Sequence, residues 1–203
     1  MAQAARKPEV TYAEYLALEA STRDKHEFHQ GEIFAMAGGT PAHAHLCGEV
    51  HALLRASLGR VPCRAFNSEL RIYVPEIDEA CYPDASIIGG KLTHDPRDAQ
   101  AATHPVALVE VLSATTEKYD RGGKFEAYRH LPSLRDDVLV SQDHNRVEHF
   151  AKNDDGSWTF RVLLAGDTLR LSGAAATVAV DELYADVDEL RASAVELKSE
   201  QVG

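Results

Sequence analysis

The sequence predicts an α/β fold in which helices flank a mixed β-sheet that continues into an antiparallel meander. Segments with helical spacing alternate with segments whose apolar residues recur every second position. Residues 105–113 are almost continuously apolar and β-branched, which is typical of a central strand buried on both faces. No repeat of about 20–50 residues is visible, so solenoids and propellers are excluded.

The first elements are a short helix and a hairpin. Thr11 followed by Glu14 forms a capping-box pattern, and the apolar residues after it are spaced as in an amphipathic helix. Two short runs then flank a turn around Gln30 and Gly31, which predicts a hairpin that ends near Gly38.

A longer helix and two strands follow. Thr40 and Pro41 fit the N-cap and first helical position, and Gly59 is a natural stop. Residues 70–74 alternate as a half-buried strand should, and residues 83–88 predict a second strand.

The second half of the chain is predicted as loop, central strand, helix and meander. Residues 91–104 are polar and lack a period, which indicates a surface loop before the central strand. A helix is expected from Thr115 or Thr116 to about His130, because Pro132 stops it. Three alternating strands then form the meander, over 137–142, 146–152 and 158–166.

The chain of 203 residues fits one domain, with a core over about 11–187 and an acidic C-terminal helix or tail over 188–203. No window is apolar enough to span a membrane, and the first residues lack the apolar stretch of a signal peptide, so a cytoplasmic location is expected. The three cysteines are too widely spaced for a CxxC motif and are expected to be reduced and buried: Cys47, Cys63 and Cys81.

The formal net charge is −11, the opposite sign from that of most proteins that bind nucleic acid. A local basic groove remains compatible with this sum if the acids lie elsewhere. Its candidate residues are Arg60, Arg64, Arg71, Lys118, Arg121, Lys124 and Arg129.

Two acids stand out from the strands. Asp84 follows Pro83, and Glu110 interrupts the apolar central strand, where an ionised carboxylate needs a cation or a metal. Neighbouring strands would bring the two acids together, and Mg²⁺ suits such a carboxylate pair. The structural alternative is that Glu110 pairs with a buried Arg or Lys and Asp84 caps a turn. Lys124 and Arg121 lie on the following helix, and the lysine could reach back toward the acids.

Several motifs in the same order resemble one family. They are HEFHQGEIFAMAG, PAHAHL, YPDASII, PVALVEVLSATTEKYDRGGKFEAYR and RVEHF. Together they resemble the Uma-type family of bacterial restriction-endonuclease-like proteins, within the PD-(D/E)xK nuclease superfamily, over about residues 11–187.

This resemblance implies a restriction-endonuclease-like fold and hydrolysis of DNA phosphodiester bonds that depends on Mg²⁺ or Mn²⁺. Asp84 and Glu110 would bind the metal, with the main-chain carbonyl of Val111 as a third ligand. The superfamily usually has a catalytic lysine two residues after the second acid, where this chain has Leu112. Lys124 is therefore the candidate for that role.

The resemblance also suggests further site residues. Glu32 could supply another acid, with Glu27 a weaker candidate, and His43 could contact phosphate or water. Asp120 shares a helix face with Lys124 and Tyr128 at a spacing of four residues, so it could orient the lysine.

Two other function classes are compatible with parts of the sequence. His43, His45 and Glu49 reproduce part of a cupin metal motif, but Pro41 and the leucine spacing favour a helix, on which the two histidines diverge by about 200°. The chain could instead be an inactive nuclease-fold module that acts in binding or assembly. For the enzyme, DNA is the expected partner, and a homodimer is plausible because a duplex has two strands.

Overall fold

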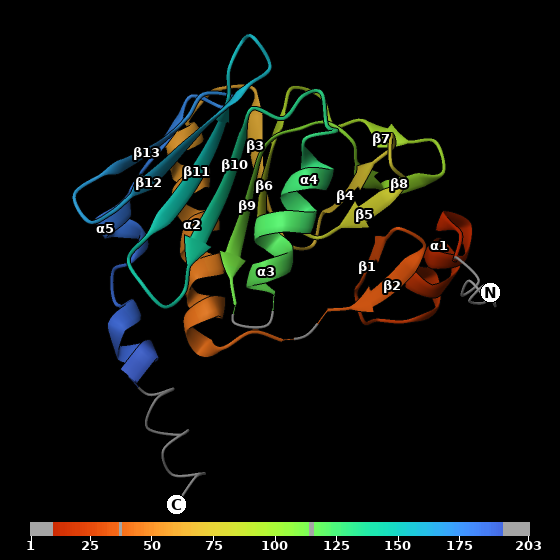
Figure 1. Cartoon of the computed structure of the whole chain (residues 1–203), viewed down its shortest axis with the longest axis horizontal. Coiled ribbons are helices and arrows are strands. Elements are labelled where there is room, and N and C mark those ends of the chain that lie inside the picture. Colours follow the sequence, from red (N-terminus) through yellow and green to blue (C-terminus); the bar gives the residue numbers. More distant parts are fainter. Residues whose placement is uncertain (1–9, 37, 114–115, 193–203) are drawn as a thin grey trace, which may run out of the picture.

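The fold is a mixed α/β arrangement of two six-stranded sheets, a two-stranded hairpin and helices that cover the sheets (Figure 1). The computed structural model describes residues 10–36, 38–113 and 116–192. The helical elements are α1 (Tyr12–Ser21), α2 (Pro41–Leu58), α3 (Glu117–Tyr119), the π-helical turn η1 (Asp120–Lys124), α4 (Phe125–Tyr128) and α5 (Val180–Leu183).

The larger sheet has the order β12-β11-β10-β9-β6-β3. Its strands are β3 (Cys63–Asn67), β6 (Ala85–Gly89), β9 (Pro105–Leu112), β10 (Asp136–Ser141), β11 (Val147–Lys152) and β12 (Trp158–Leu163). Strand β9 lies in the middle, parallel to β10 and antiparallel to β6, and β10 to β12 form the predicted meander. The central strand and the meander are therefore confirmed.

The second sheet has the order β2-β1-β5-β4-β8-β7, and the remaining two strands pair only with each other. The bounds are β1 (His26–His29), β2 (Glu32–Ala35), β4 (Arg71–Val74), β5 (Glu79–Cys81), β7 (His94–Asp95), β8 (Asp98–Ala102), β13 (Thr168–Leu171) and β14 (Ala176–Ala179).

Apolar cores lie on both faces of the larger sheet. On one face, α2 packs with β14 and α5 over side chains such as Val109 and Val138. On the other face, Tyr128 and Leu131 pack over Leu108. Strand β9 thus lies between α2 and the α3–η1–α4 helix, as Figure 1 shows, so its side chains project alternately toward the two layers.

The predicted helix starts and the first hairpin are confirmed. Thr11 forms a complete capping box with Glu14. The Thr40 hydroxyl caps α2 by accepting the main-chain N–H of His43, with Pro41 in the first turn and Gly59 at the C-cap. The β1–β2 turn places Gln30 and Gly31 at positive φ.

Two predictions for the middle of the chain, a surface loop and a half-buried strand, are wrong. Residues 91–104 are not a surface loop, because they contain β7 and β8, and Ala101 and Ala102 are fully buried. The alanine-rich strand has no β-branched signal and is held by pairing with β4. Strand β4 is not half-buried: all four of its residues are buried, because β5 and β8 flank it and apolar side chains pack on both of its faces. The pattern also missed β3, β5, β13 and β14.

The helix predicted to end near His130 is described from Glu117 to Tyr128 and widens into η1 at its centre. Thr115, one of its two predicted starts, lies outside the described residues. Of the predicted acidic C-terminal segment, 188–192 belongs to a helical stretch over 187–192, and 193–203 lies outside the described residues.

Of the three cysteines, Cys81 is buried, whereas Cys47 and Cys63 are partly exposed. All three are free thiols. The expectation of burial holds only for Cys81.

Candidate active site

Asp84 and Glu110 lie on neighbouring strands of the larger sheet. Ala85 of β6 pairs with Val109 of β9, so Asp84 comes one residue before this pair and Glu110 one residue after it. The main-chain N–H of Val111 donates a hydrogen bond of 2.8 Å to Oδ2 of Asp84. The structure therefore brings together the two predicted acids and the residue whose carbonyl was expected to join them.

Glu110 is buried at the centre of the molecule, with 3% of its surface exposed. The Tyr128 hydroxyl donates a hydrogen bond of 2.5 Å to its Oε1, and the Lys124 ammonium lies 3.2 Å from the same oxygen. Burial raises the pKa of the Glu110 carboxyl well above its usual range. Lys124 opposes this rise, whereas Asp120 and Asp84 add to it.

Lys124 lies among three buried acids. Its Nζ is 3.0 Å from Oε1 of Glu27, 3.2 Å from Oε1 of Glu110 and 3.3 Å from Oδ1 of Asp120. Burial alone would lower the pKa of Lys124, but these carboxylates outweigh it and raise the pKa well above its usual range. The lysine therefore carries its charge, and three acids share one ammonium.

The widened turn η1 positions this lysine. Asp120 and Lys124 are its first and last residues, and both are buried against the sheet. The turn also brings Gly123 against Tyr119, where a Cβ would lie 2.9 Å from the ring carbons. Because π-helical turns are rare and occur frequently at functional sites, η1 marks this segment as more than a packing helix.

His43, on α2, lies beside Asp84, on the face of β9 opposite to the helix that carries Lys124. Its Nε2 is 3.0 Å from the carbonyl oxygen of Val111 and 3.7 Å from Oδ2 of Asp84, and its Nδ1 is 3.5 Å from Sγ of Cys47. Burial, together with the nearby Asp84, raises the pKa of the Cys47 thiol. His43 thus belongs to the same site as the acids, and Cys47 was not among the predicted site residues.

Glu32 is not brought into this cluster. It is exposed on β2, whereas Glu27 on the paired strand β1 is buried and contacts Lys124. The main-chain N–H of Tyr82 also donates to Glu27. Sequence reasoning ranked these two acids in the opposite order, because the turn between them hides which one faces inward.

The basic residues proposed for a groove are only partly at the surface. Arg71 is buried and pairs with Asp98 at 3.1 Å, and Lys124 is buried among the acids. These two cannot contribute to an exposed groove, which corrects the expectation for them.

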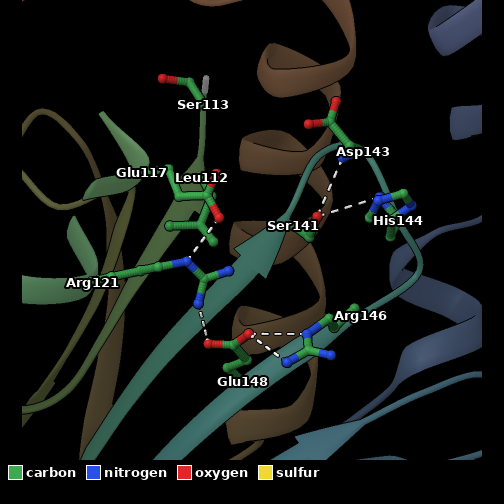
Figure 2. A pocket seen from close by; sticks show the side chains of 9 residues that line it. All are labelled: Leu112, Ser113, Glu117, Arg121, Ser141, Asp143, His144, Arg146 and Glu148. Atoms are coloured by element: carbon green, nitrogen blue, oxygen red, sulfur yellow. Dashed lines mark hydrogen bonds and ion pairs between the residues drawn. The ribbon is translucent and has the colours of Figure 1, made fainter. Parts of the chain in front are cut away.

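An open cavity of about 510 Å³ lies beyond the end of β9, and Figure 2 shows the residues that line it. Arg121 and Arg146 enter it from η1 and from the start of β11, and both pair with Glu148. Leu112 also lines it, and since Leu112 comes two residues after Glu110, both side chains leave β9 on the same face. The cavity therefore lies near the acid cluster, and its lining includes two guanidinium groups and the three acids Glu117, Asp143 and Glu148.

The cupin interpretation is excluded by the helix. His43 and His45 both lie on α2, and Nε2 of His45 is 3.2 Å from the carbonyl oxygen of Ala185, away from Asp84.

No helix within the described residues is long and apolar enough to cross a membrane.

Comparison with solved structures supports the predicted fold. The chain is similar to a crystal structure from Anabaena variabilis described as a "putative nuclease belonging to DUF820", with a TM-score of 0.70 and 15% sequence identity over 88% of this chain and 99% of the other. The restriction-endonuclease-like fold expected from the sequence is confirmed.

Comparison of sequences gives the family. Two uncharacterized Synechocystis proteins are similar to this chain: slr1290 is 39% identical over 87% of this chain and 92% of the relative, and sll1609 is 34% identical over 76% and 88%. The model of the family "Uma2: Putative restriction endonuclease" matches residues 12–181. The chain therefore belongs to the Uma2 family, as its motifs indicated.

Proposed function

We propose that this protein is a divalent-metal-dependent endonuclease that hydrolyses phosphodiester bonds in DNA. The observation that carries the proposal is the buried excess of acid around Lys124, next to Asp84. Glu27, Glu110 and Asp120 share one ammonium, and Asp84 is close enough to raise the pKa of Glu110 further. Burying uncompensated carboxylates costs several kcal/mol, so this arrangement is costly unless a second cation binds.

A contact between Glu110 and a buried lysine also fits a purely structural ion pair. The excess of acid separates the two interpretations, because one ammonium neutralises one carboxylate. A structural pair would leave the remaining acids without a cation. A divalent ion on Asp84 and Glu110 would leave the Lys124 ammonium to Glu27 and Asp120.

The donors fit a divalent cation. Carboxylate oxygens of Asp84 and Glu110 and the carbonyl of Val111 are the hard oxygen ligands that Mg²⁺ and Mn²⁺ accept. When bound there, the ion supplies Lewis-acid polarisation of the phosphate and a water of lowered pKa.

The chain's own residues provide the remaining functions. Lys124 is held by Glu27 and Asp120 with its ammonium at Glu110, so it can stabilise the negative charge that develops on phosphate. Tyr128 holds Glu110 by its hydroxyl, which fixes the carboxylate. Arg121 and Arg146 in the nearby cavity can contact the DNA backbone.

The partner would be DNA, and a homodimer in the cytoplasm would present one site to each strand of the duplex. The alternative, an inactive nuclease-fold module, is favoured only by the net charge of −11.

Cleavage of a pool of random-sequence duplexes, with the new ends mapped by sequencing, tests the proposal without knowledge of the site sequence. The intact chain should produce ends only with Mg²⁺ or Mn²⁺, and Asp84→Asn and Glu110→Gln should abolish them. Glu126→Gln, on the exposed side of the same helix, is the matched control and should cleave normally. Equal cleavage by all variants would refute the assignment, and no cleavage by the intact chain would favour the inactive module.

A further inference from the structure

His43, Cys47 and Asp84 form a group that differs chemically from the oxygen ligands just described. One ligand atom of each residue lies within 4.8 Å of those of the other two. His43 and Cys47 are four residues apart on α2, so they lie one above the other on the same face of the helix. Asp84 faces them from the start of β6.

The contacts of His43 leave one ring nitrogen available. Its Nε2 lies 3.0 Å from the carbonyl of Val111, which can only accept a hydrogen bond, so this nitrogen carries the proton and donates. The lone pair is then on Nδ1, which faces Sγ of Cys47 at 3.5 Å. Histidines that bind metals commonly donate their other N–H to a carbonyl or carboxylate in this way.

The position of the imidazole is also restricted from the other side. A Cβ on Gly39 would overlap the His43 ring, so the glycine allows the ring its place at the start of α2. The ring is therefore held between Gly39, Val111 and Cys47 before any ligand enters.

The spacing fits a tetrahedral ion. Zn–S and Zn–N bonds of about 2.0–2.3 Å place two ligands roughly 3.5 Å apart. The Nδ1–Sγ separation already has this value. The ligand atoms of the group lie within 4.8 Å of one another, so Asp84 must move closer to complete three ligands. A fourth position would then stay open, as in catalytic zinc sites.

We infer that His43 Nδ1, Cys47 Sγ and Asp84 form a binding site for a borderline-soft transition-metal ion of the Zn²⁺ or Co²⁺ class, preferred over Mg²⁺. Thiolate and imidazole select such ions, whereas Mg²⁺ prefers oxygen. The inference shares Asp84 with the proposed function and names a different metal for that carboxylate, but the ion can bind whether or not the chain cleaves DNA.

Titration of the full chain with Co²⁺, followed by absorption, tests the inference. The intact chain should show the visible bands of a tetrahedral ion and a near-ultraviolet thiolate-to-cobalt charge-transfer band, both displaced by Zn²⁺ and not by equimolar Mg²⁺. Cys47→Ala should lose the charge-transfer band and weaken Co²⁺ binding at least about tenfold. Cys63→Ala, which removes a cysteine outside the group, should keep both. Circular dichroism checks that each variant is folded.

His43→Gln provides a second variant if Cys47→Ala does not fold, and it should also weaken Co²⁺ binding. Absence of the charge-transfer band from the intact chain would overturn the inference. Persistence of the band in Cys47→Ala, or displacement of Co²⁺ by Mg²⁺ as readily as by Zn²⁺, would also overturn the inference.

The same titration on Glu110→Gln separates this inference from the proposed function. Glu110→Gln should keep the charge-transfer band and lose cleavage. If the intact chain shows the charge-transfer band but does not cleave DNA, the metal site is supported and the nuclease proposal is refuted. If it shows Mg²⁺-dependent cleavage without the band, the nuclease proposal is supported and the metal site is refuted.

Discussion

Two neighbouring acids at the start of β10 have opposite surroundings. Asp136 is fully buried and satisfied: its carboxylate pairs with Nε2 of His149 at 2.8 Å and accepts the main-chain N–H of Gly173 at 2.8 Å. Asp137 is also buried, but among the described residues no side chain donates a hydrogen bond to its carboxylate oxygens. Burial raises the pKa of Asp137 to about 7, against a smaller opposing effect of Lys124.

The raised pKa of Asp137 predicts a stability change with a defined sign. The folded carboxyl binds its proton more tightly than the unfolded one, whose pKa is about 3.9. The protonated carboxyl therefore contributes its full stability below the unfolded pKa, and this contribution is lost as the pH rises through the folded pKa of about 7. Asp137→Asn should therefore be more stable than the intact chain at pH 8, by about 4 kcal/mol at most, with a smaller gain near pH 4.5. Urea unfolding at several pH values measures this, and a gain independent of pH would contradict it.

A functional residue could be predicted from the sequence where a charged side chain occurs in a segment that is expected to be buried. Glu110 was visible because a carboxylate interrupts an apolar strand, and the structure shows it buried beside Lys124. Cys47 was not recognised, although its spacing of four residues from His43 on a predicted helix could have revealed the pair. Asp137 was not predicted, because the residues that surround its buried carboxyl come from distant segments of the chain.

At the level of elements, Asp136 connects three parts of the fold. Its carboxylate joins β10 to His149 of β11 and to Ser172 and Gly173 in the turn between β13 and β14. Asp136→Ala would leave these groups buried without a partner and should lower the free energy of unfolding by about 3–5 kcal/mol. Asp137→Asn, one residue along, is the control expected to change stability in the opposite direction at pH 8. Equal effects of the two variants would contradict this account.

The turn η1 contains two adjacent glycines with different surroundings. Gly123 has no room for a Cβ beside Tyr119, whereas Gly122 faces open space. Gly123→Ala should destabilise the fold by about 1–3 kcal/mol through overpacking. Gly122→Ala, the matched control, should be neutral or stabilise by roughly 0.5–1 kcal/mol, because alanine loses less conformational freedom than glycine when the chain folds. Thermal unfolding of both variants is the measurement, and the reverse order would show that η1 is not packed as described.

Elements with local signals were predictable, and those fixed by pairing were not. The caps at Thr11 and Thr40 and the strand 105–112 follow from side chains within the element. Strand β8 has an alanine-rich sequence and exists because β4 offers it a partner, so a local pattern assigned it to a loop. The widening at η1 likewise depends on packing against the sheet.

At the scale of the whole molecule, a net charge of −11 requires that any contact with DNA be local. If Arg146 contacts the backbone, Arg146→Gln should weaken duplex binding and reduce the slope of log affinity against log salt by about 1. Arg170→Gln, on the exposed side of β13, should leave the slope unchanged. Binding measured over a range of salt concentrations decides this, and an equal slope for the Arg146 variant would exclude that contact.

In the proposed enzyme, Asp84 holds a divalent metal ion next to the buried acids. Calorimetric titration with Mg²⁺ or Mn²⁺, with and without a short non-cleavable duplex, tests it most directly when the intact chain is compared with Asp84→Ala. The intact chain should bind the ion and the variant should not, with or without the duplex. Equal binding by both, or no binding by the intact chain even with the duplex present, would contradict it.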